Sequence, residues 1–222
     1  MIITVNQKKL SLILKSAERI ISRGHSLPIL QTVLLKAEKG VLKVSSTNLE
    51  LGANYLISTK IDKEGSVAVP AKIFSDFISN INAEKVNISA KGNVLEISSD
   101  KYQTKLLCSD VSEFPILPVN KEKNGFKIPS GELKNALTSV IDATALSETR
   151  PELSGVYISF GAQKIEFAAT DSFRLSEKVL TIKDGISKVI ILPRNTALEL
   201  IRVLSDNVDD VLVSFSENQV FI

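Results

Sequence analysis

The sequence predicts an α+β protein built from two tandem copies of one domain with antiparallel sheets. Three observations support this fold class: a long internal repeat, a weaker repeat of β-hairpins inside each copy, and strand-like segments that outnumber the helices without strict alternation. The composition is that of a folded protein, because 44% of the 222 residues are hydrophobic and 23% are charged. These values exclude wholesale disorder.

The internal repeat has an offset of 123 residues. The matched pairs are Leu10 and Leu133, Leu14 and Leu137, Ser16 and Ser139, Pro28 and Pro151, Val33 and Val156, Thr47 and Thr170, Pro70 and Pro193, and Ile78 and Ile201. Identity between the copies is low, but the order of expected elements matches as well. We therefore predict the tandem duplication of a domain of roughly 120 residues.

The expected domains are residues 1–120 and 128–222, with a linker at 121–127. The stretch 115–125 contains two prolines, several charges and Gly125, a composition typical of linkers. A complete second copy is expected to extend to about residue 246. The second domain is therefore expected to be truncated, since a terminal strand without a partner exposes backbone donors and acceptors.

The first helix is expected at about 6–22 and has two different faces. Its apolar stripe consists of Leu10, Ile13, Leu14, Ala17, Ile20 and Ile21. The opposite side carries Lys8, Lys15 and Arg19, with Ser11 and Ser22 beside them. Leu12 lies on this polar side, and the pattern does not explain it.

A second helix, at about 71–81, follows Pro70. Its expected core residues are Ile73, Phe74, Phe77, Ile78 and Ile81, and its expected outward residues are Lys72, Ser75, Asp76 and Ser79. The corresponding helices of the second copy offer Lys134 in one case, and Arg194 and Arg202 in the other. Each helix is expected to precede a β-hairpin, such as residues 37–46 (AEKGVLKVSS) and 90–99 (AKGNVLEISS).

The sequence argues against an enzyme. It has one histidine and one cysteine, so neither a zinc site of several His and Cys ligands nor a Cys/His nucleophile pair is expected. Phosphate-binding glycine motifs and paired acidic residues are missing too, and we predict no catalytic residue, metal or cofactor. His25, between Gly24 and Ser26, is expected in an exposed loop. Cys108 has no disulfide partner, which fits a reducing compartment.

The chain has no apolar run of the ~20 residues that span a bilayer, and its first residues are not expected to form a signal peptide because they lack a basic region. The net charge of +2 is too small to indicate nucleic acid binding by itself. The basic helix faces are either ordinary solvated surface or surfaces for a phosphate backbone. Aromatic residues make up 5% and tryptophan is missing, so a base-stacking platform is not expected. The residues alone indicate a binding module built from repeats.

The chain resembles the bacterial β sliding clamp family along its whole length. The strings that carry the resemblance are 27–30 (LPIL), 47–50 (TNLE), 69–72 (VPAK), 113–115 (EFP), 150–153 (RPEL), 169–175 (ATDSFRL) and 192–194 (LPR). Two positions depart from the family pattern: Asn48 stands where aspartate is usual, and Ser172 where glycine is usual.

The resemblance implies a DNA clamp fold, with helices lining a central hole around duplex DNA and sheets outside. Family members have three domains, and two subunits close head to tail. This chain would be the first domain and most of the second. The implied function is that of a processivity factor, a non-catalytic subunit of the DNA-directed DNA polymerase. The implied partners are duplex DNA, the replicative polymerase catalytic subunit, the clamp loader, other clamp-motif proteins and a second subunit. The implied location is the cytoplasm, at the nucleoid.

The resemblance also implies two sets of site residues. The DNA-binding set is Lys8, Lys15, Arg19, Arg23, Lys72, Lys134, Arg150, Arg194 and Arg202. The set for partner peptides with apolar and aromatic side chains is Leu153, Thr170, Ser172, Phe173, Arg174 and Leu175. For the two leucines, an ordinary core position is the alternative.

Two other classes of function remain as alternatives. A generic α+β enzyme could contain an acid/base pair that sequence patterns do not mark, but it lacks a nucleophile, metal or cofactor signature. A plain protein-interaction module would share the repeat, but it would have no reason for a basic helix face.

Overall fold

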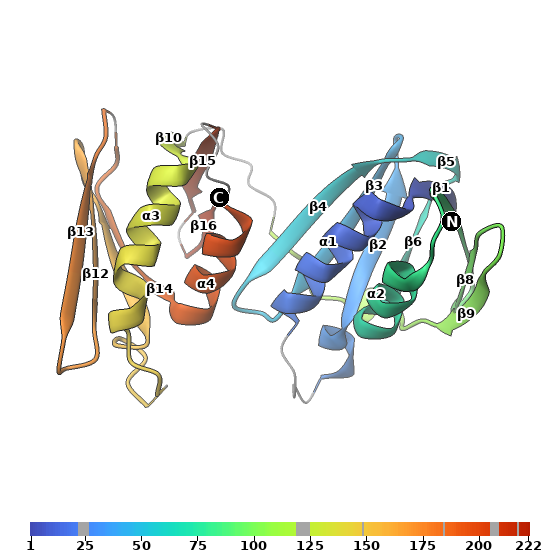
Figure 1. The fold of residues 1–222 in the computed structure, drawn as a ribbon, viewed down its shortest axis with the longest axis horizontal. Coiled ribbons are helices and arrows are strands. Elements are labelled where there is room, and N and C mark those ends of the chain that lie inside the picture. The colour runs from blue at the N-terminus through green and yellow to red at the C-terminus, as the bar shows by residue number, and fades with distance from the viewer. Residues whose placement is uncertain (22–26, 119–124, 148, 184, 205–208, 217) are drawn as a thin grey trace. The chain divides into compact units, whose positions relative to one another are not determined.

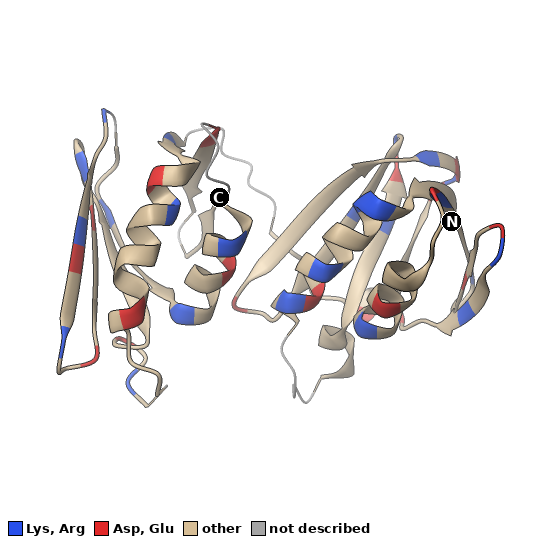
Figure 2. Cartoon of the chain, in the orientation of Figure 1, with Lys and Arg blue, Asp and Glu red and all other residues tan. Residues whose placement is uncertain are grey.

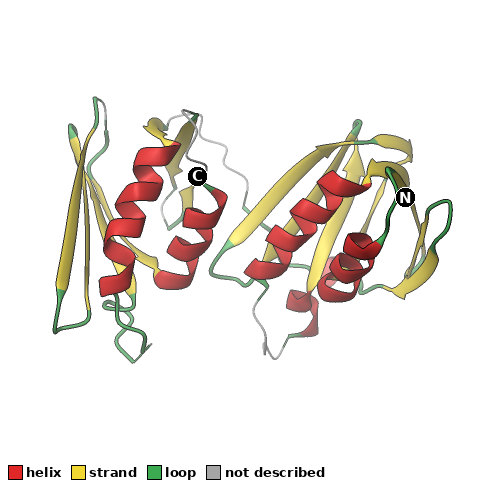
Figure 3. Ribbon diagram, viewed as in Figure 1, coloured by secondary structure: helices red, strands yellow, loops and turns green. Residues whose placement is uncertain are grey.

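The computed structural model describes residues 1–21, 27–118, 125–147, 149–183, 185–204, 209–216 and 218–222. Two compact units make up the chain, Met1–Leu117 and Pro118–Ile222 (Figure 1). Both combine helices with antiparallel sheets, as Figure 3 shows, so the predicted α+β class is confirmed.

The first unit contains two antiparallel sheets and two α-helices. Its elements are β1 (Ile2–Asn6), α1 (Gln7–Ile20), η1 (Pro28–Gln31), β2 (Thr32–Glu38), β3 (Val41–Thr47), β4 (Gly52–Ser58), β5 (Lys60–Lys63), β6 (Gly65–Pro70), α2 (Ala71–Asn80), β7 (Lys85–Lys91), β8 (Val94–Ser98), β9 (Gln103–Leu107) and η2 (Val111–Glu113). The sheet orders are β4-β3-β2-β6 and β5-β1-β7-β8-β9.

The second unit repeats this plan. Its elements are β10 (Phe126–Pro129), α3 (Ser130–Val140), η3 (Ile141–Ala143), β11 (Gly155–Phe160), β12 (Lys164–Thr170), β13 (Leu175–Thr181), β14 (Lys188–Pro193), α4 (Arg194–Val203), β15 (Asp210–Phe215) and β16 (Val220–Phe221). The sheet orders are β13-β12-β11-β14 and β10-β15-β16. Phe126 and Lys127, which the sequence analysis assigned to the linker, lie in β10.

Strand register confirms the predicted duplication. Thr32 pairs with Pro70 in the first four-stranded sheet, and Gly155 pairs with Pro193 in the second. Both members of the second pair are 123 positions after their counterparts. The two sheets therefore have the same strand order and the same register, which low sequence identity alone could not establish.

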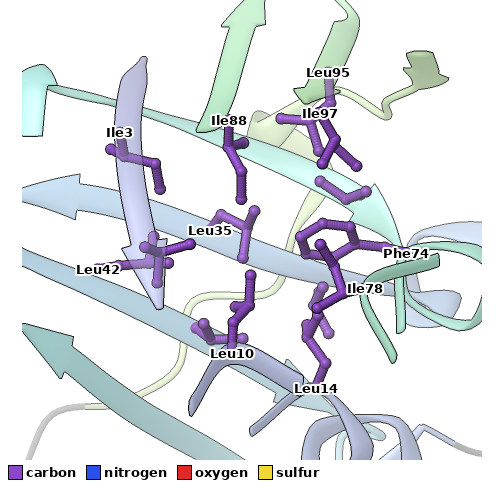
Figure 4. Packing of buried hydrophobic residues seen from close by; sticks show 14 of the residues in the cluster. Ile3, Leu10, Leu14, Leu35, Leu42, Phe74, Ile78, Ile88, Leu95 and Ile97 are labelled. Atoms are coloured by element: carbon purple, nitrogen blue, oxygen red, sulfur yellow. The ribbon is translucent and has the colours of Figure 1, made fainter. Parts of the chain in front are cut away.

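The first core lies between the two helices and the two sheets (Figure 4). Leu10 and Leu14 of α1 meet Phe74 and Ile78 of α2, and all four side chains are at most 1% exposed. The sheets contribute further fully buried side chains, among them Ile3, Leu35, Leu42, Ile88, Leu95 and Ile97. Asn6 begins α1 as its N-cap, because its Oδ1 accepts a hydrogen bond from the Lys9 N–H at 3.1 Å.

Three expected helix positions were wrong because α1 and α2 pack against each other. Ser11 and Ser75, expected to face outward, are 8% and 2% exposed. The Ser11 and Ser79 hydroxyls are 3.0 Å apart, so small polar side chains form part of the helix contact. The buried stripe of α2 consequently begins at Ala71 and includes Ser75, and Ile73 is left 58% exposed.

Part of the outer face of the first four-stranded sheet is covered by residues 109–117, which we call the closing segment. Ser109 N–H donates to Ala68 O at 2.9 Å. Phe114, 6% exposed, packs with Ile29, Leu30 and Ala68 in a small separate core. The helices therefore bury the inner face of this sheet, and the closing segment covers part of the outer face; Leu56 of β4 remains 68% exposed there.

An aromatic cluster joins the two sheets of the second unit. Phe126 and Phe215 belong to the three-stranded sheet, and Phe160 belongs to the four-stranded sheet. The Phe160 ring centroid lies 5.5 Å from that of Phe126 and 4.9 Å from that of Phe215, both with edge-to-face geometry.

Candidate functional site

The exposed face of α1 carries the predicted basic cluster. Lys8, Lys15 and Arg19 are exposed, and Figure 2 shows basic positions following this helix. A rise of 1.5 Å per residue places Lys8 and Lys15 about 10 Å apart along the helix axis. Lys72, at the beginning of the adjacent α2, is also exposed. Leu12 is 69% exposed on the same face of α1.

The helices of the second unit carry a weaker positive charge. Arg202 is exposed but forms an ion pair with Glu199, and Lys134 is only partly exposed. Arg150 is exposed in the turn before β11. Arg23 and His25 lie outside the described residues.

Arg194, a member of the predicted DNA-binding set, packs against its own unit. Its side chain is only 23% exposed. The guanidinium donates hydrogen bonds to Ile141 O and to Thr144 Oγ1, at the end of α3 in its own unit. Because the long arginine side chain can reach a carbonyl group on a neighbouring element, the periodicity of α4 alone could not predict where the Arg194 guanidinium lies.

The loop between β12 and β13, which we call the Ser172 loop, is held by its own side chains. Thr170 Oγ1 accepts from the Ser172 N–H at 3.1 Å and donates to Arg174 O at 2.7 Å. Asp171 Oδ1 accepts from the Phe173 and Arg174 N–H groups, both at 3.0 Å. These backbone N–H groups, together with the Arg174 guanidinium 3.0 Å from Oδ2, lower the pKa of Asp171.

The first unit has the same loop between β3 and β4, the Leu49 loop. Asn48 Oδ1 accepts from Glu50 N–H at 3.0 Å and from Leu51 N–H at 2.7 Å. The amide oxygen thus makes the bonds that the Asp171 carboxylate makes in the second unit. The substitution of Asn48 for the usual aspartate therefore preserves the turn.

A left-handed backbone explains why the position of Ser172 suits glycine. Ser172 has φ 78°, and Leu49, its counterpart 123 positions earlier, has φ 74°. Glycine adopts this conformation without strain, whereas a side chain makes it costly. Ser172 therefore preserves the shape of the loop at an energetic cost.

The predicted peptide-binding residues lie at one end of the second four-stranded sheet. Leu175 pairs with Thr170 across β13 and β12. When the pairing of β11 with β12 is extended by two residues, Gly155 lies opposite Thr170. The turn that contains Leu153 comes directly before Gly155, so it lies at the same end of the sheet. Phe173 is 97% exposed and Leu175 64% exposed. Leu175 is therefore not a core residue, and Leu153 is half-buried.

The sequence analysis missed an apolar surface on the outer face of this sheet. Tyr157, Val179 and Ile191 are 42%, 54% and 46% exposed. Tyr157 and Ile191 pair across β11 and β14. Their counterparts in the first unit, Leu34 and Ala68, pack in the small core under the closing segment. Strand alternation could have identified these residues, since each is next to a buried neighbour.

Within the described ranges, no three His, Cys, Asp or Glu residues cluster closely enough to hold a metal ion. Among the described residues, no helix has both the length and the apolar character needed to cross a membrane.

Fold and surface together define a class: duplicated α+β domains whose paired helices are backed by antiparallel sheets, with a basic face on the first helix. Comparison with known families makes the assignment specific. Residues 1–118 match the family "DNA polymerase III beta subunit, N-terminal domain", and residues 127–222 match "DNA polymerase III beta subunit, central domain". The chain belongs to the DNA polymerase III beta subunit family.

Individual relatives agree with this assignment. The chain is 26% identical to the beta sliding clamp of Rickettsia bellii over 98% of its own length and 59% of the relative. It is 28% identical to the Staphylococcus aureus beta sliding clamp, over 91% of the chain and 56% of the relative. The solved DNA polymerase sliding clamp from Bacillus subtilis superimposes with a TM-score of 0.94 at 26% identity, covering 99% of this chain and 61% of that one. The chain thus spans less than two thirds of the length of these relatives.

Proposed function

We propose that this chain acts as part of a ring-shaped sliding clamp, a non-catalytic processivity factor that encircles duplex DNA and tethers the replicative polymerase. The observation that carries the proposal is the match of both halves of the chain, in order, to the two beta subunit domains. The proposed location is the cytoplasm, at the nucleoid. Further proposed partners are the clamp loader and other proteins with a clamp-binding motif.

The proposed DNA-facing surface is centred on α1 and the beginning of α2. Lys8, Lys15, Arg19 and Lys72 are exposed there, and the further members are Arg23, Lys134, Arg150 and Arg202. Lysine and arginine attract phosphates without reading base sequence. A sparse set of such contacts suits a ring that must slide, because the closed ring rather than tight binding keeps the protein on DNA.

Charge reversal tests this surface. Lys8→Glu, Lys15→Glu and Lys72→Glu together are expected to weaken association with duplex DNA most strongly at low salt. Each lost phosphate contact should lower the slope of log K against log salt by about 0.9. A titration of labelled duplex at several salt concentrations measures both effects.

A matched control reverses three exposed lysines on the five-stranded sheet that lie outside β9, namely Lys60, Lys63 and Lys91. It has the same net charge as the first variant and is expected to bind duplex more tightly than that variant. Equal losses in the two variants would show that net charge, rather than the helix face, governs association.

The proposed peptide site consists of Leu153, Thr170, Ser172, Phe173, Arg174 and Leu175. Its exposed apolar side chains can contact aliphatic and aromatic groups of a linear motif, while the Arg174 guanidinium adds hydrogen-bond donors at the edge. The Leu49 loop has the same backbone bonds but lacks the Phe-Arg pair. We therefore propose one such site, on the second unit.

Leu175→Lys tests this site. The substitution is expected to lower affinity for a peptide carrying the polymerase's clamp-binding motif by at least tenfold, because it places a charge in the apolar contact. Fluorescence anisotropy measures the affinity, and Leu49→Lys in the first unit is the matched control. Normal peptide binding by Leu175→Lys, or loss in Leu49→Lys instead, would contradict the assignment.

Assembly with a second subunit is proposed at the open edge of the five-stranded sheet. β9 lies at that edge, with Leu107 71% exposed. An edge strand offers unpaired backbone groups to a strand from another chain.

A further inference from the structure

Arg194 forms hydrogen bonds both to the segment that follows α3 and to the turn that precedes β11. Its guanidinium donates to Ile141 O and Thr144 Oγ1, which follow α3. Its backbone N–H donates to Ser154 O at 3.0 Å, in the turn before β11. A single residue at the first position of α4 thus contacts both segments.

The second of these segments is a compact turn of residues 150–154, which we call the Leu153 turn. The Leu153 and Ser154 N–H groups both donate to Arg150 O, at 3.0 and 3.2 Å. Leu153 O accepts from the Ala145 N–H at 2.9 Å, which ties the turn to the residue that follows Thr144. Displacement of Thr144 would therefore be transmitted directly to Leu153.

The location of the guanidinium explains its hydrogen bonding. The end of α3 presents carbonyl groups without helical partners and the negative end of the helix dipole, so a cation is favoured there. Thr144 Oγ1 also donates to Ile141 O, at 2.8 Å, which completes a network of three groups. Asp142 is 3.9 Å from the guanidinium and 91% exposed, so its ion pair contributes little.

This arrangement is specific to the second copy. The counterpart of Arg194 in the first unit is Ala71, which is 2% exposed and has no side chain that could reach α1 by hydrogen bonding. The difference between the copies coincides with the proposed peptide site, which also belongs to the second unit only. Pro193 pairs with Gly155, so Arg194 follows directly at the end of the sheet where that site lies.

We propose that Arg194 is a positioning residue for peptide binding and not a DNA contact: it holds Thr144 and, through it, the Leu153 turn in the place where Leu153 meets the partner peptide. This inference rests on the proposed peptide site.

Three variants distinguish a positioning role in peptide binding from a direct contact with DNA. The probes are a fluorescent peptide carrying the polymerase's clamp-binding motif and a labelled duplex. Arg194→Gln is expected to lower peptide affinity about tenfold, the effect of one or two lost hydrogen bonds from a charged donor. Duplex association and its salt slope should not change. Arg194→Lys should restore part of the peptide affinity. Asn195→Ala, at an exposed position of the same helix that belongs to neither proposed site, is the control and should leave both peptide affinity and duplex association unchanged.

A double-mutant cycle tests whether Arg194 acts through Thr144. Thr144→Val should also weaken peptide binding, and the double variant should be weakened less than the two single effects predict together, because both remove one network. Hydrogen exchange at the Ala145 amide should accelerate in each variant while α3 amides keep their protection. Thr144→Val conserves shape, so it answers the question even if Arg194→Gln folds poorly.

The outcomes separate this inference from the proposed site. If Leu175→Lys weakens peptide binding but Arg194→Gln and Thr144→Val do not, the role of Arg194 is refuted and the site stands. If Leu175→Lys has no effect, the site itself is wrong. Loss of duplex association in Arg194→Gln, with normal peptide affinity, would return Arg194 to the DNA-facing set.

Discussion

Asp171 and Asn48 perform the same structural task with different chemistry. Each side-chain oxygen accepts two backbone N–H groups at the start of its loop. Only the carboxylate can be protonated, and its pKa lies below the ordinary value of 3.8. The two copies of the loop should consequently respond differently to acid.

The Ser172 loop is expected to loosen below about pH 3.8, whereas the Leu49 loop is not. A depressed carboxyl pKa in the folded state means that the stabilisation is complete above the unfolded value and is lost as pH falls through the folded one. NMR of the Phe173 and Arg174 amides, with Glu50 and Leu51 as internal controls, measures the difference. Asp171→Asn should remove the pH dependence, and its persistence in that variant would assign it to another group.

Individual side-chain roles were only partly predictable from sequence. Periodicity correctly placed Lys8, Lys15 and Leu10, which lie in the middle of their respective faces. It failed for Ser75, because the face of α2 that packs on α1 contains small polar residues that resemble solvent-exposed ones. For Arg194, the decisive partner belongs to a different element, which no local pattern reveals.

At the scale of elements, regular structure was easier to predict than irregular structure. The expected helix at 6–22 is α1 at Gln7–Ile20, and the one at 71–81 is α2 at Ala71–Asn80. The sequence analysis assigned no element to residues 109–114 of the closing segment, and it counted residues 115–117 in a stretch with the composition of a linker. Segments that cover a sheet without regular periodicity leave no such signal, so Phe114 was not recognised as a buried residue.

Phe114→Ala is expected to destabilise the first unit by about 3 kcal/mol, because it empties the small core under the closing segment. Urea denaturation measures the loss. Ile116→Ala is the matched control, since Ile116 belongs to the same segment and is 95% exposed; it should change stability little. Equal stabilities of the two variants would mean that the segment does not contribute to the fold.

At the scale of the whole molecule, the duplication was the most informative prediction. The matched prolines Pro70 and Pro193 mark the same register position in both four-stranded sheets. The other sheet of each unit diverges. Val5 pairs with Val86, whereas Ile128, 123 positions after Val5, pairs with Val211, 125 positions after Val86. An ungapped comparison of the copies cannot detect that shift of two residues.

Each unit has its own hydrophobic core, so we expect two separable unfolding transitions. Phe114→Ala should move only the transition of the first unit. Differential scanning calorimetry resolves the transitions, and hydrogen exchange assigns each one to a unit. A single transition that shifts as a whole in this variant would show that the two cores unfold cooperatively.

The closing segment also determines how mechanical tension would enter the first unit. The chain that continues beyond Pro118 is anchored by Phe114 and by the Ser109–Ala68 pairing before it reaches β9. A pulling force from that side would therefore reach the sheet first through Phe114 and the Ser109–Ala68 hydrogen bond at β6. Helices α1 and α2 lie on the opposite face. The contacts that would bear such tension are thus separate from the exposed side chains of α1.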